Sequence, residues 1–290
     1  MKIDIIAGAR PNFMKISPII DEIVRLQSKG KSIAFRLVHT GQHYDKNMSD
    51  SFFKQLNIPE PDYNLGVGSG TQAEQTAYIM IKYEKLIIKN IPDICLVVGD
   101  VNSTMACSIV AKKMNIKVAH VEAGIRSNDI TMPEEINRMV TDSITDYFFT
   151  TSIYANKNLL NLGVLKRKIF FVGNTMIDTL LNNYDNFIQP KFFKEMKLIL
   201  NNYLVLTMHR PANVDDEIKL KNFLQIIEDN VKDYPVLFPV HPRTKSIINN
   251  IKIDFKNIKM IKPLSYLEFN YIVKNSICAI TDSGGITEET

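Results

Sequence analysis

Three carboxylic acids stand where short apolar runs end or a helical pattern begins, and they are the first candidates for acid–base chemistry. Asp100 follows the run Ile94–Val98, and Glu122 follows the run Val118–Val121. Glu134 stands beside a proline at the start of a helical pattern. A buried carboxylate, or one near a like charge, has a raised pKa that suits proton transfer near neutral pH. One such acid is more often a cap or half of an ion pair, but three converging acids favour chemistry.

Basic side chains occupy similar positions. Arg10, Pro11 and Lys15 follow the run Lys2–Ala7, and Arg138 lies four residues after Glu134. Proline suits the first turn of a helix, and a helix N-terminus offers free N–H groups and a positive dipole end to an anion. An arginine adds a bidentate contact to such an anion. This pattern is compatible with a phosphate-binding turn, although a plain strand-to-helix turn produces the same pattern and is favoured by the local sequence alone.

A second candidate for phosphate binding is the segment Asp282-Ser283-Gly284-Gly285, with Glu289 in the helical turn that follows. Glycines let the backbone approach phosphate oxygens, and a carboxylate such as Glu289 accepts hydrogen bonds from ribose. An ordinary helix N-cap explains the segment equally well. His209 and His241 each follow an apolar run and are candidates for a general acid or a phosphate ligand, the alternative being a structural role. Phe269 is a candidate for stacking on a base, although its pattern is more typical of core.

Several other kinds of chemistry find no support in the sequence. It contains neither a Walker A loop nor the GxGxxG fingerprint, and it lacks the GxSxG elbow of serine hydrolases. His39, His43 and His120 do not have the spacing of a zinc site. We therefore predict an enzyme that uses neither a cofactor nor a metal.

The composition is typical of a globular protein in a reducing compartment. The net charge of +4 comes from scattered lysines, which argues against nucleic acid as a partner, and no apolar stretch reaches the length of a membrane span. The chain begins directly in a predicted strand, which argues against a signal peptide. Cys95, Cys107 and Cys278 lie in apolar stretches without a CxxC pair, so we predict buried thiols and a cytoplasmic location.

The elements that position these residues are short β-branched strands alternating with amphipathic helices. Nearly continuous apolar runs are typical of strands buried on both faces of a parallel sheet, so the pattern predicts an α/β doubly wound fold. The helical patterns are Ser17–Ser28, Gln72–Lys89, Met105–Met114, Pro133–Ile144 and Ile218–Asp229. The predicted strands are Lys2–Ala7, Phe35–Thr40, Ile94–Val98, Val118–Val121, Tyr147–Thr150, Ile169–Val172, Tyr203–Met208, Val236–Val240, Lys259–Ile261 and Cys278–Thr281.

A break after the sixth strand predicts two Rossmann-like domains. We place the boundary at residue 173, giving an N-terminal domain over residues 1–173 and a nucleotide-binding domain over residues 174–290. Ligands of open α/β sheets bind beyond the carboxyl ends of the strands. The expected site is therefore a cleft across which the two domains face each other.

The candidate residues together resemble the non-hydrolysing UDP-N-acetylglucosamine 2-epimerases. Each motif is weak alone, but the ordered set is specific and runs along the whole chain, and Arg10-Pro11 with Lys15 favours the non-hydrolysing branch. The motifs are Gly8-Ala9-Arg10-Pro11 with Lys15, Thr40-Gly41-Gln42-His43, Gly99-Asp100, His120-Val121-Glu122-Ala123-Gly124-Ile125-Arg126, Pro133-Glu134-Glu135-Ile136-Asn137-Arg138, Val172-Gly173-Asn174, His209-Arg210 with Asn213, His241-Pro242 and Asp282-Ser283-Gly284-Gly285 with Glu288-Glu289.

The resemblance implies a fold like the B-type glycosyltransferases, a UDP-sugar substrate and a homodimer. It implies that Asp100, Glu122, Glu134 and His209 carry out the chemistry, with Lys15 nearby. It places the diphosphate, ribose and uracil of the substrate on the remaining candidates: Arg10, Arg138, Asn213, His241, Phe269, Ser283, Gly284, Gly285 and Glu289. Family members extend beyond the position of Thr290, so the resemblance also implies that the second domain is incomplete in this chain and that the activity of these 290 residues alone is doubtful.

The implied reaction is epimerisation at C2 of UDP-N-acetylglucosamine. Because no carbonyl activates the C2 hydrogen, simple deprotonation is slow. Elimination of UDP from C1 gives a 2-acetamidoglucal, and UDP then returns to C1 while C2 receives a proton on its opposite face. A hydrolysing 2-epimerase, a B-type glycosyltransferase and a non-enzymatic nucleotide-sugar sensor are the alternatives. Diacetamido and uronic acid sugars would use the same chemistry.

Overall fold

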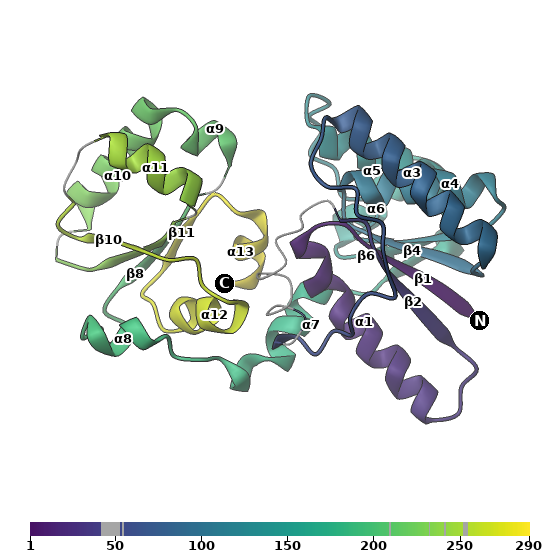
Figure 1. Cartoon of the computed structure of the whole chain (residues 1–290), viewed down its shortest axis with the longest axis horizontal. Helices are drawn as coiled ribbons and strands as arrows, with labels where there is room; N and C mark the ends of the chain where they lie inside the picture. Colours follow the sequence, from purple (N-terminus) through teal and green to yellow (C-terminus); the bar gives the residue numbers. More distant parts are fainter. Residues whose placement is uncertain (42–52, 54, 209, 232, 241, 252–254) are drawn as a thin grey trace. The chain divides into compact units, whose positions relative to one another are not determined.

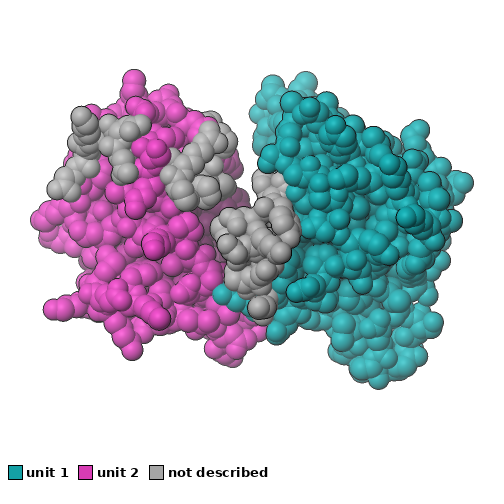
Figure 2. Space-filling model, in the orientation of Figure 1, with its two compact units in different colours: residues 1–179 teal, residues 180–290 magenta. Residues whose placement is uncertain are grey.

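The chain folds into two compact units, each around its own parallel sheet. The computed structural model describes residues 1–41, 53, 55–208, 210–231, 233–240, 242–251 and 255–290. The units are Met1–Thr179 and Leu180–Thr290, which Figure 2 draws in different colours. The division falls within the helix α7, Thr175–Asn182, whereas residue 173 lies just before this helix. The predicted α/β fold with two parallel sheets is confirmed.

In the described part of the first unit, the sheet contains seven parallel strands in the order β3-β2-β1-β4-β5-β6-β7. Because β1 pairs with both β2 and β4, the strand order reverses between β1 and β4. The loops after these two strands therefore diverge and leave room for a ligand at a topological switch point. The bounds are β1 Lys2–Ala7, β2 Ala34–His39, β3 Tyr63–Asn64, β4 Ile94–Val98, β5 Lys117–Val121, β6 Tyr147–Thr150 and β7 Ile169–Phe171.

Helix α3 of the first unit packs an apolar face into the core beside the sheet. The helix α3 begins at a capping box formed by Thr71 and Glu74, and it buries Ile79 and Tyr83 in the same core as Val97 of β4. Helices α3, α4 and α5 pack side by side (Figure 1). The bounds are α1 Arg10–Ser28, α3 Gln72–Lys89, α4 Asn102–Lys113, α5 Pro133–Ile144 and α6 Ile153–Asn161, with a 3-10 turn over Lys166–Lys168.

Among its described residues, the second unit has four parallel strands in the order β10-β9-β8-β11. Its core joins Leu206 and Phe238 of the sheet to Leu220 and Leu224 of α10, whose N-cap Asp216 accepts hydrogen bonds from two backbone amides. The bounds are β8 Leu204–Thr207, β9 Val236–Pro239, β10 Ile258–Ile261, β11 Ala279–Thr281, α8 Lys191–Glu195, α9 Pro211–Val214, α10 Glu217–Asn230, α11 Pro242–Ile251, α12 Tyr266–Lys274 and α13 Gly284–Glu289, with a 3-10 turn over Tyr184–Asn186.

The cysteines only partly match the prediction. Cys95 and Cys107 are buried, and burial raises the pKa of Cys95 to about 12, so that its thiol stays protonated. Cys278 is exposed instead, because it precedes β11, which is an edge strand of the second sheet in the described part of the chain. No described helix is both long and apolar enough to cross a membrane.

Candidate active site

The loops at the switch point of the first sheet are joined by one buried side chain, Asn12. Its Oδ1 accepts hydrogen bonds from the amides of Gly8 and Ala9 at 3.1 and 2.8 Å. Its Nδ2 donates to the carbonyl of Val98 at 3.2 Å. The amides of Gly8 and Ala9, part of the predicted phosphate-binding turn, are therefore already bonded within the protein. These bonds and Pro11 explain why α1 begins at Arg10, seven residues before the predicted start at Ser17.

Lys15 and Glu122 form an ion pair beside this loop. Their Nζ and Oε2 atoms are 2.6 Å apart, and the two side chains are only 13% and 10% exposed. A Cβ placed on Gly99 would lie 3.5 Å from both atoms, so the pair lies directly over the end of β4. Glu122 has a φ of 70°, in the left-handed region that side chains other than glycine seldom adopt. Such a conformation persists only where the surroundings enforce it, and it is commonest at functional sites.

A second ion pair links Asp100 to Arg138, which comes from α5. The guanidinium also contacts Glu135 at 3.0 Å. Burial lowers the pKa of Arg138, but the charges and hydrogen bonds of Asp100 and Glu135 together outweigh it and raise the pKa. Asn137 donates to the carbonyl of Asp100 at 2.8 Å and to Asn102 at 3.2 Å. The structure thus brings together Asp100 and Arg138 by one set of contacts and Lys15 and Glu122 by another, on neighbouring loops.

The two adjacent glutamates of α5 have different environments. Glu135 is buried and accepts hydrogen bonds from the backbone of Ser127 and Asn128. Burial opposes its ionisation, but these bonds and Arg138 lower the pKa of Glu135 below its usual value. Glu134 is half-buried and makes no hydrogen bond or ion pair to the described residues. It lies one helical turn before Arg138, and so on the same side of α5.

In the second unit, Asp282 joins the loops that follow β8 and β11. Its Oδ2 accepts hydrogen bonds from the backbone of Arg210 and the side chain of Asn213, each at 3.0 Å. Ser283 is the N-cap of α13 and accepts from the amide of Ile286 at 3.5 Å. The predicted cap is therefore present. Gly284 and Gly285 form the first turn of the same helix.

Glu289 and Phe269 lie in the same unit. Burial raises the pKa of Glu289 to about 7; a hydrogen bond from Tyr266 opposes the shift and the charge of Glu288 adds to it. Glu289 also lines a cavity of about 340 Å³ together with Lys274. Phe269 is half-buried and packs against the apolar core around Tyr203, so its structural role is the one typical of its sequence pattern.

Two predicted site residues, and the side chain of a third, lie outside what the structure describes. His209 and His241 are outside the described residues, as are Gln42 and His43 of the second motif. Arg10 opens α1, but its side chain is not among those described. Within the described residues, no three His, Cys, Asp or Glu side chains are grouped so as to hold a metal ion.

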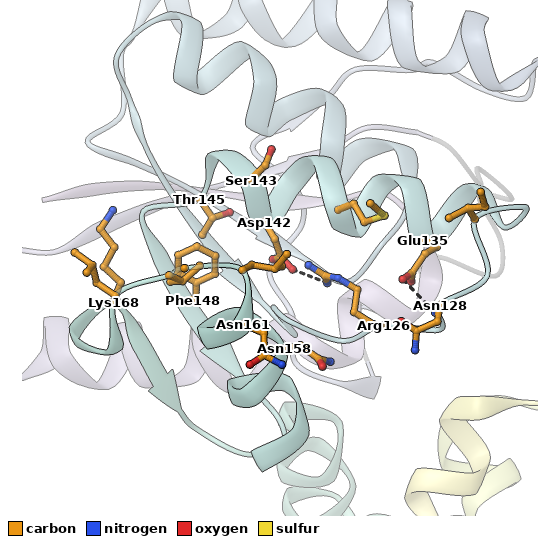
Figure 3. Close-up of a pocket in the computed structure, with 16 residues that line it drawn as sticks. Arg126, Asn128, Glu135, Asp142, Ser143, Thr145, Phe148, Asn158, Asn161 and Lys168 are labelled. Atoms are coloured by element: carbon orange, nitrogen blue, oxygen red, sulfur yellow. Dashed lines mark hydrogen bonds and ion pairs between the residues drawn. The ribbon is translucent and has the colours of Figure 1, made fainter.

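A cavity of about 830 Å³ lies elsewhere in the first unit (Figure 3). It runs between α5 and α6 over Phe148, and none of the predicted site residues lines it. Arg126 and Asp142 form an ion pair of 2.7 Å in its wall, and the second terminal nitrogen of Arg126 is buried without a hydrogen-bond partner among the described residues.

Comparison with known proteins decides the family. The family model described as UDP-N-acetylglucosamine 2-epimerase matches residues 25–290. The chain belongs to this family. The UDP-N-acetylglucosamine 2-epimerase of Methanocaldococcus jannaschii is 43% identical over all of this chain and 80% of the relative. A structure of the M. jannaschii UDP-GlcNAc 2-epimerase in complex with UDP-GlcNAc and UDP matches with a TM-score of 0.87 at 42% identity, over 100% of this chain and 81% of that one.

A relative with a different substrate is also close to this chain. The UDP-2,3-diacetamido-2,3-dideoxy-D-glucuronate 2-epimerase of Pseudomonas aeruginosa is 37% identical over all of this chain and 80% of the relative. The 2-epimerase family therefore includes enzymes for more than one UDP-sugar, and family membership alone does not fix the sugar.

Sequence reasoning did not single out Asn12 and Asp142, and it named His120 and Asp282 only as members of longer motifs. All four make hydrogen bonds to the loops described above. For Asp142 a signal existed: with Glu135 and Arg138 it forms a polar stripe at helical spacing on α5. Buried Glu135, Asn137 and Asp142 show that this polar face, and not an apolar one, is turned inward.

Proposed function

We propose that this chain converts UDP-N-acetylglucosamine and UDP-N-acetylmannosamine into each other by epimerisation at C2, without net hydrolysis. The observation that carries the proposal is the cluster at the switch point of the first sheet. There Asp100 and Glu122, two acids on adjacent loops, each contact a cation. Family membership and the ligands of the M. jannaschii structure support a UDP-sugar as substrate.

The chemistry follows from the acidity of the sugar. The C2 hydrogen is not acidic, so UDP leaves C1 as the C2 proton is removed, and a glycal forms. In our proposal Asp100, Glu122 and Glu134 exchange protons with C2, since each half-buried carboxylate is able to act as base on one face or acid on the other. Lys15 holds Glu122 in place, and Arg138 with Arg10 stabilises the negative charge on the departing diphosphate.

The second unit is proposed to bind UDP. Ser283, Gly284 and Gly285 lie at the N-cap and in the first turn of α13, which supports their assignment to the diphosphate. Glu289 is assigned to the ribose hydroxyls and Phe269 to the uracil. Asn213 and His241 are assigned to the substrate in the same way, and His209 to the chemistry. Phe269 packs against the core and is half-buried as a residue.

One incubation in D₂O tests the proposal. With UDP-N-acetylglucosamine alone, we expect UDP-N-acetylmannosamine that carries deuterium at C2 in its proton NMR spectrum. Free N-acetylmannosamine with UDP would instead show a hydrolysing enzyme, and unchanged substrate would indicate a transferase or a sensor. Product without deuterium at C2 would contradict proton exchange with solvent.

A second substrate is supported by one specific comparison. The P. aeruginosa relative acts on a diacetamido uronate, and its identity to this chain is 37%. The same incubation with UDP-2,3-diacetamido-2,3-dideoxyglucuronate separates the two sugars by their kcat/KM values. We expect the larger value for UDP-N-acetylglucosamine, in line with the M. jannaschii relative at 43% identity.

The affinity for UDP should depend on pH through Glu289. With its pKa at about 7, this carboxyl is mostly protonated at about pH 6 and mostly ionised at about pH 8, where it accepts hydrogen bonds best. We expect UDP to bind roughly five- to tenfold more tightly at the higher pH by calorimetry. Glu289→Gln should remove this difference, while the titration of UDP itself affects both proteins equally. An unaltered pH dependence in the variant would show that Glu289 does not contact UDP in this way.

The assembly and location are also proposals. We propose a homodimer, because Ile136 and Met139 of α5 and Tyr78 and Ile81 of α3 expose large apolar side chains on packed helices. Light scattering should then give about twice the chain mass of 33.1 kDa, and a mass of one chain would contradict the proposal. We propose a cytoplasmic enzyme that supplies cell envelope polysaccharides, and cell fractionation tests this location.

A further inference from the structure

The ring of His120 connects the two loops that carry the candidate acids. His120 lies in β5, two residues before Glu122, and it is fully buried. Its Nε2 is 2.8 Å from the carbonyl oxygen of Gly99, the residue before Asp100. Its Nδ1 is 2.7 Å from Oδ1 of Asp142 on α5. One side chain therefore spans from the loop after β4 to the helix that supplies Arg138.

Asp142 extends this connection to the loop after β5. Its Oδ2 accepts a hydrogen bond from the amide of Gly124 at 3.0 Å. The same oxygen is 2.7 Å from a guanidinium nitrogen of Arg126 (Figure 3). Burial opposes ionisation of this carboxyl, but His120 and Arg126 outweigh it and lower the pKa of Asp142. Asp142 is thus an acceptor on both oxygens. Since the carbonyl of Gly99 is also an acceptor, the ring satisfies both contacts only with a proton on each nitrogen.

We propose that His120 and Asp142 are positioning residues for the reaction assigned above, acting as an imidazolium–carboxylate pair. This inference rests on the proposed function. Glu122 lies between His120 and Gly124, both of which are bonded to Asp142, and it has a left-handed backbone. The pair fixes the backbone on both sides of Glu122 and holds the carbonyl of Gly99. Gly99 directly precedes Asp100, and a Cβ on it would lie 3.5 Å from both atoms of the Lys15–Glu122 contact. Neither residue touches the substrate in this assignment.

A positioning role predicts a defect in turnover and not in binding. Acids displaced by about 1 Å lose on the order of 10²-fold in rate, because proton transfer depends on close approach. Binding of UDP depends on other residues. We therefore expect a fall in kcat with little change in KM.

The test compares Asp142→Asn with Asp146→Asn in the whole chain. The amide introduced by Asp142→Asn places a donor opposite another donor, either the His120 ring or the Gly124 amide. We therefore expect kcat to fall about 100-fold, while KM stays within about threefold of the parent. Asp146 is a matched control: it accepts from the amide of Val118 at the other end of β5 and pairs with Lys112, away from both loops. Asp146→Asn should keep kcat within about twofold of the parent, because a partly exposed pair contributes little. Equal losses in the two variants, or full activity of Asp142→Asn, would overturn the proposal.

Two further measurements guard against a variant that fails to fold. His120→Gln keeps a donor toward the Gly99 carbonyl and His120→Ala does not, so kcat should fall less in the glutamine variant; equal values would count against the assignment. Nitrogen-15 NMR of histidine-labelled protein, with His120 assigned through His120→Gln, should show protons on both ring nitrogens at neutral pH. A singly protonated ring would refute the ion pair even if the protein did not epimerise its substrate, which separates this failure from failure of the proposed function.

Discussion

Glu122→Gln should lower kcat for epimerisation by about 10³-fold, the middle of the range that general acid–base catalysis contributes. The amide keeps the size of the side chain but no longer exchanges a proton with C2 or neutralises Lys15, whose Nζ is 2.6 Å away. Incorporation of deuterium at C2 should fall by the same factor, because both measurements follow the same proton. The Kd for UDP, measured by calorimetry, should stay within about threefold, since Glu122 is assigned to the sugar.

Glu22→Gln provides the control for charge removal. Glu22 also forms an ion pair, with Arg25 at 2.5 Å, but on the exposed surface of α1. An exposed pair contributes little to stability, so this variant should match the parent in kcat and in thermal midpoint. If Glu122→Gln retained more than about a tenth of the parental kcat, Glu122 would not be an essential proton carrier.

Gly124→Ala should cost about 2–5 kcal/mol of unfolding free energy, from backbone strain and overpacking together. Gly124 has a φ of 80°, and a Cβ there would lie 2.5 Å from the carbonyl oxygen of Ala155 and 2.8 Å from Leu159. Real Cβ atoms do not approach backbone this closely, so either α6 or the loop after β5 must move. Because the amide of Gly124 is bonded to Asp142, kcat should fall as well. Urea unfolding measures the first effect.

Gly163→Ala separates the cost of a left-handed backbone from the cost of a steric clash of the added Cβ. Gly163 has a φ of 83°, but a Cβ there would meet no atom within 4 Å. This variant should lose only about 1–2 kcal/mol, the cost of the left-handed backbone alone, and keep its activity. Equal destabilisation of the two variants would show that the contact with Ala155 is relieved without cost.

Most of the strands were predictable, because a strand buried on both faces of a parallel sheet has a nearly continuous run of apolar residues in the sequence. All ten predicted strands occur within one or two residues of their expected ends. β3 was missed because it has only two residues, Tyr63 and Asn64, both exposed and without periodicity. The apolar pattern of α1 begins only at Ser17, but Pro11 indicated the earlier start of the helix, because proline suits the first helical turn.

The sequence indicated that Asp100 and Glu122 lie on neighbouring loops, but it did not indicate their contacts. Position after a strand was enough to single out Asp100 and Glu122, because carboxyl ends of parallel strands share one edge. That each acid pairs with a particular cation depends on side-chain reach from α1 and α5, which strand order does not encode. The left-handed backbone of Glu122 was not predictable from the sequence either, since glutamate has no preference for this conformation.

The face of α5 that turns inward is polar, and this has a consequence for how the protein can change. The same short helix supplies Arg138 to one acid, Glu135 to the backbone of Ser127 and Asn128, and Asp142 to Gly124. A shift or tilt of α5 would break all of these contacts together. Adaptation to a new sugar or temperature must therefore come from the surrounding loops. Any loosening of α5 that altered catalysis would also destabilise the fold around it.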